Sequence, residues 1–405
     1  MAPNQGLVHP KEYDIKDSNV ELIGTAIDHQ VKYNSAATEP AWHANGIGTA
    51  PGLYIWRIEQ FEVVPWPRNK YGQFLDGDSF IVLHSYKIGE QEGNERLGHD
   101  IFFWLGAHTT QDEAGTAAYK TVELDEFLGG AATQHREVQQ SPSEDFLSLF
   151  PRLSIRSGGV RSGFRHVEEA GDEGNAEEIL TLLRVFKNPA AGTGANGIVV
   201  HEVEPTWNSL DDSDVFILDT GGKIWVWQGK DCSPMEKAKA AQVVHDLTLA
   251  KHVDVEVLSQ AESRSRRVLN LLGADDNTPT TGLHKRRPVS TPSSSSSRSS
   301  SNKRLFRLSD ASGELTFQLV KDGGRISASD FDGNDVFLLD DAGRAVWVWI
   351  GSGASQAEKA TWLKVAQAYI TRLVGEQGDE ESYLVPVAKV KEGAECRAFR
   401  RAIEA

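Results

Sequence analysis

Short apolar runs and amphipathic segments alternate along the chain in an order that occurs three times. The first run of each copy begins with an Asp, and the second run ends in a Gly. The copies read DSFIVL and IFFWLG (78–83, 101–106), DVFILD and IWVWQG (214–219, 224–229), and DVFLLD and VWVWIG (335–340, 346–351). These runs are rich in β-branched and aromatic residues, which is typical of buried strands in one sheet.

A helix that carries a Glu follows each pair of runs. The distance from the last Trp of the strand to that Glu is nine positions in every copy: Trp104 to Glu113, Trp227 to Glu236, and Trp349 to Glu358. In the third copy one apolar stripe has helical spacing and comprises Trp362, Val365, Ala366, Tyr369, Ile370 and Leu373. The agreement in order, residue type and spacing predicts three homologous domains.

The fold class that follows is α+β, with a central sheet and a long helix packed on one of its faces. We expect an N-terminal extension over 1–45 and a Ser-rich flexible linker over 274–303, since neither segment is rich enough in apolar residues to form a core. The predicted domains cover 46–165, including a connector, then 166–273 and 304–405.

Composition narrows the function classes. The 405 residues carry a formal net charge of −16, which argues against a nucleic-acid binder, because such proteins neutralise phosphates with basic side chains. The two cysteines, Cys232 and Cys396, are too few to stabilise a chain of this size and favour a reducing compartment. No signal-peptide pattern and no transmembrane segment is visible, so the cytoplasm is the expected location.

The recurring acids are the candidate chemistry. Each copy pairs an Asp before the first strand with the Glu at the helix start: Asp78 with Glu113, Asp214 with Glu236, and Asp335 with Glu358. Carboxylates together with main-chain carbonyls, here from the preceding Gly77, Ser213 and Asn334, are the ligands that Ca²⁺ prefers. The alternative is structural, because a Glu in the first helical turn and an Asp beside a strand also stabilise those positions.

Other motifs do not support an enzyme. GTGANG at 192–197 lacks the strand–turn–helix context of a dinucleotide site, and DFDGNDVF at 330–337 has Asp335 where a calcium-binding EF-hand loop needs Gly. No Cys and His lie at zinc-binding spacing, and no Ser or Cys lies in a nucleophile elbow. The sequence predicts a non-enzymatic protein.

Long stretches of the chain resemble the gelsolin superfamily, and in particular its short three-domain members, severin and fragmin. The likeness covers about 45–403 without the linker. It is most specific at PGLYIWRIEQFEVVPWP (51–67), YGQFLDGDSFIVL (71–83), FFWLGAHTTQDEAGTAAYKTVELDEFLGGAATQHREVQ (102–139) and SGGVRSGFRHV (157–167). The resemblance implies that each domain is a mixed sheet sandwiched between a long and a short helix. It also implies calcium-dependent severing of actin filaments, capping of their barbed ends and binding of actin monomers.

The resemblance assigns ligands to four predicted calcium sites. In the first domain it implies an internal site of Gly77, Asp78, Glu113 and Val160, and a second site, shared with actin, of Asp125, Gly130 and Ala132. The other two domains match the family's internal sites through Asp214 with Glu236 and Asp335 with Glu358, and a fourth ligand stays unassigned in both. On the helix at 110–128, the residues at actin-facing positions are Tyr119, Val122 and Glu126.

Basic residues of the connector match the family's binding region for filament sides and phosphoinositides such as phosphatidylinositol bisphosphate. They are Arg152, Arg156, Arg161 and Arg165. The family's basic strand in the second domain is reduced here to Arg184 and Lys187, so severing is less well supported than capping. The alternative is therefore capping or bundling of filaments without severing.

Overall fold

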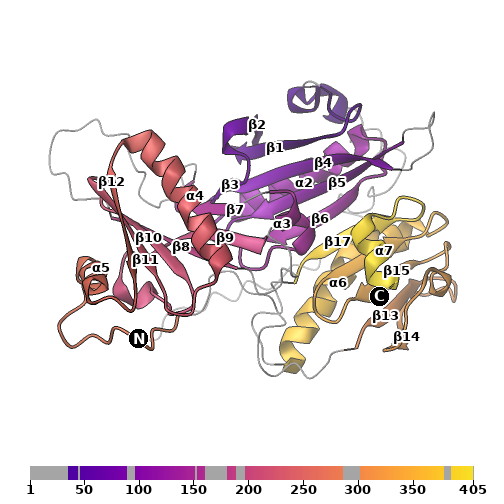
Figure 1. The fold of residues 1–405 in the computed structure, drawn as a ribbon. Coiled ribbons are helices and arrows are strands. Elements are labelled where there is room, and N and C mark those ends of the chain that lie inside the picture. Colours follow the sequence, from indigo (N-terminus) through magenta and orange to yellow (C-terminus); the bar gives the residue numbers. More distant parts are fainter. Residues whose placement is uncertain are drawn as a thin grey trace, which may run out of the picture.

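The structure is a computed structural model of the 405-residue chain. The residues that it describes are 35–43, 46–88, 96–150, 153–159, 180–187, 197–285, 302–377 and 385–404. They form three α+β domains, with the first in contact with both of the others (Figure 1).

The described part of domain 1 contains six strands, one long helix and one short helix, and it includes the strands and the long helix that the sequence predicts. Its elements are β1 (Gly52–Glu59), β2 (Glu62–Pro65), β3 (Gln73–Leu75), β4 (Ser79–Ile88), β5 (Arg96–Leu105), α2 (Gln111–Phe127), β6 (Thr133–Val138) and the short α3 (Glu144–Ser148). Apolar residues from alternate positions of the strands pack against α2 on one face and α3 on the other.

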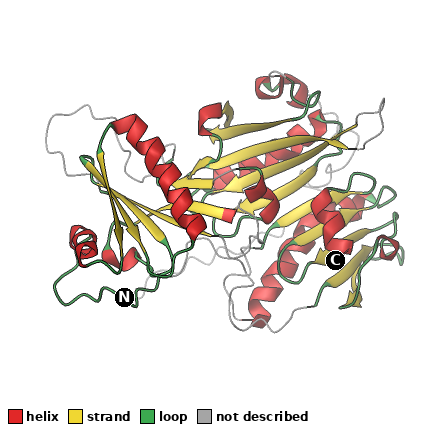
Figure 2. Ribbon diagram, in the orientation of Figure 1, coloured by secondary structure: helices red, strands yellow, loops and turns green. Residues whose placement is uncertain are grey.

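Domains 2 and 3 repeat this arrangement (Figure 2). Domain 2 follows β7 of the connector (Leu153–Arg156) and contains β8 (Thr181–Lys187), β9 (Ile198–Val203), β10 (Val215–Asp219), β11 (Lys223–Gln228), α4 (Pro234–Lys251), β12 (Asp254–Ser259) and α5 (Arg266–Leu271). Domain 3 contains β13 (Arg304–Ser309), β14 (Thr316–Asp322), β15 (Val336–Asp340), β16 (Val346–Ile350), α6 (Gln356–Gln377), β17 (Val387–Lys391) and α7 (Arg397–Glu404). In each, two neighbouring strands are parallel and the other pairs antiparallel, which confirms the mixed sheet between a long and a short helix.

The sheets continue across the domain boundaries. β17 of domain 3 pairs antiparallel with β6 of domain 1, so that ten strands run in the order β14-β13-β15-β16-β17-β6-β5-β4-β1-β2. On the other side, β7 pairs in parallel with β3 of domain 1 and with β9 of domain 2. The domains are therefore joined by main-chain hydrogen bonds as well as by side chains.

Two segments outside the predicted domains pack against them. Residues 35–43 of the expected extension lie on domain 1, where Trp42 is fully buried with its ring edge-on to Trp56 at 5.1 Å. Residues 274–285 of the expected linker lie on domain 2, where Leu283 joins the apolar cluster around α5 and the Gly282 and Leu283 N–H groups donate to Asp212. The linker prediction therefore began too early.

In the described residues, none of the helices is both long enough and apolar enough to span a membrane.

Candidate functional site

Each predicted Asp–Glu pair lies beside an arginine from the first strand of its sheet. The guanidinium Nε lies 2.6–3.2 Å from the aspartate Oδ2 in all three domains. The pairs are Arg57 with Asp78 (3.2 Å), Arg184 with Asp214 (2.6 Å), and Arg307 with Asp335 (2.8 Å).

Strand register places these arginines. Each one is the cross-strand partner of a Phe two positions after the Asp: Arg57 of Phe80, Arg184 of Phe216, and Arg307 of Phe337. Side chains two positions apart on a strand share a face, so each Arg and Asp are diagonal neighbours on one face of the sheet. The structure thus adds a third repeated residue that sequence reasoning missed. The repeated Asp-x-Phe together with a basic residue in the preceding strand is the signal that could have found it.

In domains 2 and 3, the helix-start glutamate links the long helix to the strand that carries the arginine. In domain 2, Ser233 and Glu236 form a reciprocal capping box, in which the Ser233 N–H donates to Glu236 Oε2 at 2.7 Å. The Lys187 N–H at the end of β8 donates to Glu236 Oε1 at 2.8 Å. Glu236 therefore has the structural role that the sequence analysis gave as the alternative to calcium binding, because it caps α4 and links it to β8.

Domain 3 repeats this geometry, and domain 1 does so in part. The Ser355 N–H donates to Glu358 at 3.0 Å, and the Asp310 N–H, just after β13, donates at 2.8 Å. In domain 1 the Glu113 N–H donates to Thr110 Oγ1 at 3.2 Å, and the Thr109 hydroxyl donates to the Glu113 carboxylate at 3.2 Å.

In domains 2 and 3, the predicted Asp and Glu both contact the first strand of their sheet or the residue just after it. Asp214, Glu236, Asp335 and Glu358 are all buried. Burial raises the pKa of Glu358 above its ordinary value, and the nearby charges of Asp310 and Asp335 add to the shift. Two buried carboxylates with main-chain oxygens close by suit a hard divalent cation. A cation there would have to replace the guanidinium and N–H donors that now hold these oxygens.

The Gly that ends each second strand is required by the same site. The N–H groups of Gly106, Gly229 and Gly351 each donate, at 3.0 Å, to the main-chain carbonyl of the site Asp. A Cβ on Gly229 would lie 2.8 Å from the Asp214 carbonyl oxygen and closer still to that of Asp212. Only Gly lets the two turns approach this closely.

The connector approaches the domain 1 site. The Gly77 N–H donates to the Gly158 carbonyl at 2.8 Å, and a Cβ on Gly159 would lie 2.6 Å from Asp78 Oδ1. Val160, the next residue and a predicted carbonyl ligand, lies outside the described residues. Ser213 and Asn334 occupy the turns that precede β10 and β15, next to their site aspartates.

At the second predicted site of domain 1, Asp125 and the Gly130 carbonyl contact lysines of domain 3. Asp125 Oδ1 accepts a hydrogen bond from the Ala132 N–H at 2.9 Å, and the Gly130 N–H donates to the Asp125 carbonyl at 2.7 Å. The Lys391 ammonium donates to the Gly130 carbonyl oxygen and lies 3.6 Å from Asp125 Oδ2. The Lys389 ammonium lies 3.7 Å from the same oxygen. A cation carried by domain 3 therefore occupies the predicted ligand set.

The predicted actin-facing residues form a stripe on α2. Tyr119 is 48% exposed, and Val122 and Glu126, three and seven positions later, are partly exposed on the same side. The N-terminal segment flanks this stripe, because Trp42 Nε1 donates to Glu123 at 2.9 Å. Asp125, with its domain 3 lysines, flanks the other side, so the stripe lies between these two contacts.

The predicted basic region is only partly described. Arg156 forms an ion pair with Glu202 of β9 at 2.6 Å. Arg152, Arg161 and Arg165 lie outside the described residues. Arg184 is buried at the Asp214 site, and its guanidinium therefore does not contribute to a basic surface.

Comparison with known proteins agrees with this repeated architecture. A family described as "Gelsolin repeat" matches residues 60–147, 196–266 and 320–400, which fall one in each domain. The chain belongs to the gelsolin family. The resemblance seen in the sequence is thereby confirmed.

Three relatives of this gelsolin-family chain match it over most of their own length and most of its length. "Gelsolin-like protein 1" of Lumbricus terrestris is 39% identical over 99% of both chains. "Severin" of Echinococcus granulosus is 36% identical over 90% of this chain and 92% of its own. "Actin depolymerising venom protein gelsolin 1" of Platymeris rhadamanthus is 34% identical over 88% of this chain and 89% of its own.

Proposed function

We propose that this chain is a non-enzymatic regulator that severs actin filaments, caps their barbed ends and binds actin monomers under the control of calcium. Membership of the gelsolin family supports the actin-binding class, and relatives named for severing and for actin depolymerisation match it over most of their length. Cytoplasm and cytoskeleton are the locations that follow from such a function.

The observation that carries the proposal is the lysine contact at Asp125. The resemblance assigns Asp125 and the Gly130 carbonyl to an actin-shared calcium site, and Lys391 of domain 3 contacts both of them. Docking of domain 3 and binding of a divalent cation therefore compete for the same oxygens. A protein with this competition would release domain 3 from domain 1 when calcium rises.

Calcium, when bound, would supply positive charge to the buried carboxylates and tie each long helix to its sheet. The residues of this chain that would hold it are Asp78 with Glu113, Asp214 with Glu236, Asp335 with Glu358, and Asp125. Neighbouring carbonyls of Gly77, Ser213, Asn334, Gly130 and Ala132 complete the proposed sets. The exposed Tyr119 and its neighbours Val122 and Glu126 would then contact actin from α2.

Two parts of the proposal rest on the resemblance alone. Arg152, Arg156, Arg161 and Arg165 would contact phosphoinositides or the filament side. Capping of barbed ends is also proposed from the resemblance, whereas severing has the added support of a relative named severin. The alternative is capping or bundling without severing.

The decisive experiment follows fluorescent actin filaments by microscopy, with calcium or with chelator. Severing predicts that calcium raises the number of filaments as their mean length falls, whereas capping alone stops growth at barbed ends without new ends. Bundling predicts thicker filaments. If calcium changes neither filament number nor end dynamics, the proposal is wrong.

A residue test uses Asp125→Asn, which keeps the shape of the side chain and an oxygen to accept the Ala132 N–H. We expect weaker calcium-dependent binding of actin monomers, measured by fluorescence titration. Asp246→Asn on the far helix α4 is the matched control and should bind as the parent does. Equal affinity of the Asp125 variant and the parent would contradict the assigned site.

A further inference from the structure

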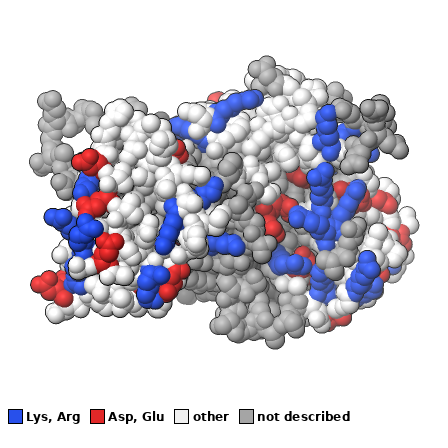
Figure 3. Space-filling view, viewed as in Figure 1, with Lys and Arg blue, Asp and Glu red and all other residues white. Residues whose placement is uncertain are grey.

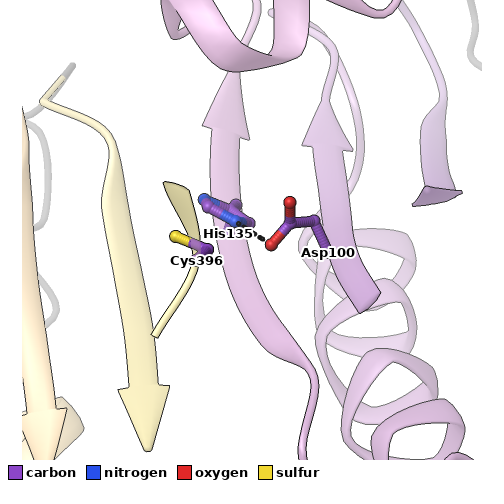
Figure 4. Close-up of side chains that lie close together, drawn as sticks. All are labelled: Asp100, His135 and Cys396. Carbon is purple, nitrogen blue, oxygen red and sulfur yellow. Dashed lines mark hydrogen bonds and ion pairs between the residues drawn. The ribbon is translucent and has the colours of Figure 1, made fainter. Parts of the chain in front are cut away.

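A cluster of three metal-ligating side chains lies where domain 3 docks on domain 1, apart from the predicted calcium sites. Asp100 comes from β5, His135 from β6 and Cys396 from the turn that precedes α7, and their ligand atoms all lie within 4.8 Å of one another. Figure 4 shows the three side chains close together, with His135 between the other two. Because these residues are far apart in the sequence, they do not form a zinc-binding motif that the sequence alone would reveal.

The histidine is held in place by aromatic side chains from both domains. Its ring stacks on Phe102 with centroids 4.3 Å apart and meets the edge of Trp347 of domain 3 at 6.0 Å. His135 Nε2 lies 3.4 Å from Asp100 Oδ1, as the dashed line in Figure 4 marks. A buried ring with so little freedom is preorganised for a ligand at the nitrogen that faces Asp100 and Cys396.

Cys396 can serve as a thiolate ligand only once a metal replaces its proton, because burial raises the pKa of its thiol to about 12 and the nearby Asp100 adds to the shift. Cys396 is buried, and the Phe399 N–H in the first turn of α7 donates to its Sγ at 3.4 Å. Main-chain N–H groups and the positive end of a helix dipole both stabilise negative charge on sulfur.

An adjoining cavity gives access and room for a further ligand. It has a volume of about 540 Å³ and is lined by Asp100 and His135 among others. Arg397, Arg400 and Arg401 also line it, and Figure 3 shows basic side chains gathered over the α7 region. Because this basic rim disfavours a cation held by charge alone, the affinity must come from bonds to sulfur and nitrogen. Thiolate and imidazole favour Zn²⁺ over Ca²⁺ and Mg²⁺.

We propose that Asp100, His135 and Cys396 bind one zinc ion, with a water molecule from the cavity as the fourth ligand. Binding releases the thiol proton of Cys396 to solvent, so the bound ligand is the thiolate. Two ligands belong to domain 1 and one to domain 3, beside the main-chain pairing of Ala388 with His135. Zinc therefore binds only the docked arrangement of these domains and stabilises it by mass action.

The test titrates the full-length, chelator-treated protein with Co²⁺, which reports a thiolate ligand by a charge-transfer band in the near ultraviolet. We expect about one equivalent with that band, displaced by Zn²⁺. Cys396→Ser should abolish the band and weaken Zn²⁺ binding by about 100-fold or more. Cys232→Ser, at the other buried cysteine, lies in domain 2 and should leave both unchanged. Asp100→Asn, which leaves every thiol in place, should weaken Zn²⁺ binding by about 10-fold or more.

Stability provides the readout for docking. Zn²⁺ should raise the thermal unfolding midpoint of the parent and of Cys232→Ser in a concentration-dependent way, and should not raise that of Cys396→Ser. Circular dichroism of each variant without metal confirms that it is folded. Co²⁺ binding without the thiolate band, or equal Zn²⁺ affinity in the parent and Cys396→Ser, would overturn the site. A normal band without a rise in the midpoint would overturn the stabilisation of docking.

Discussion

Replacing Arg184 with Met tests whether the arginine at each predicted calcium site supplies the positive charge that a bound calcium ion would otherwise supply. Arg184 is 1% exposed; its Nε lies 2.6 Å from Asp214 Oδ2, and its Nη2 donates to the Lys285 carbonyl at 2.8 Å. Met retains much of the apolar stem beside Phe186 and Phe216 but removes the charge. The buried Asp214 carboxylate then loses this cation, which costs about 3–5 kcal/mol in comparable buried pairs.

The expected loss of stability in Arg184→Met depends on whether calcium is present. In chelator, a destabilisation of that size should lower the unfolding midpoint of domain 2 by about 10 °C or more, for a domain of roughly 100 residues. In saturating calcium, the metal would supply the missing charge at Asp214 and Glu236, so most of the loss should disappear. Tryptophan fluorescence follows the transition, because Trp225 and Trp227 are buried in domain 2.

Arg264→Met is the matched control, because Arg264 is exposed and pairs with Glu262 at the surface. Its effect should stay within about 0.5 kcal/mol, with or without calcium. An equal loss for Arg184→Met in calcium and in chelator would mean that calcium does not reach Asp214. A loss under about 1 kcal/mol in chelator would mean that the pair contributes no more than an exposed ion pair, which would refute the reasoning.

Three further predictions concern other parts of the fold. Gly229→Ala should destabilise domain 2 by about 1–3 kcal/mol in thermal unfolding, because the added Cβ would clash with main-chain carbonyls. Gly222→Ala is the control: its added Cβ would have no neighbour within 4 Å, so the stability should change by no more than about 0.5 kcal/mol. Burial lowers the pKa of His201 from 6.5 to about 4, so the stability that its neutral form contributes is present above pH 6.5 and is lost as pH falls toward 4. Urea unfolding between pH 7 and 5 should show a loss of up to about 1.4 kcal/mol per pH unit below 6.5, and an unchanged slope in His201→Gln would refute this assignment. Lys391→Ala removes one of the two domain 3 cations beside Asp125, the one that also donates to the Gly130 carbonyl. It should lower the calcium concentration for half-maximal actin binding by about fivefold or more, so an unchanged midpoint would count against the competition.

The repeated fold was predictable because its signals are local. Trp225 and Trp227 pack toward α5, and Ile224 and Val226, which alternate with them along the strand, pack toward α4. An unbroken apolar run therefore correctly indicates a strand that is buried on both faces. The nine-residue spacing to the helix-start Glu is local as well, since one short loop connects strand and helix. These features depend on residues that are close in the sequence, so they can be recognised without knowledge of the tertiary fold.

The partners of the site residues were not predictable in the same way. Arg57, Arg184 and Arg307 reach their aspartates through cross-strand register, and the number of residues between Arg and Asp differs among the domains. The segment 274–285 is polar by composition, yet it is fixed by Leu283 in an apolar cluster and by N–H donors to the buried Asp212. Both outcomes depend on contacts between segments that are distant in the sequence.

The predicted calcium sites are of two kinds, which differ in the domain that supplies the basic side chain beside the carboxylate. At Asp78, Asp214 and Asp335 the nearby guanidinium belongs to the same domain, so its replacement by a metal would rearrange side chains within one sheet. At Asp125 the ammonium belongs to domain 3, so the proposed calcium binding there would be linked to the separation of domain 3 from domain 1. Linkage is reciprocal, and any ligand that favours separation must therefore raise calcium affinity at Asp125. Actin bound at the α2 stripe would be such a ligand, whereas a zinc ion that holds the two domains together would lower that affinity.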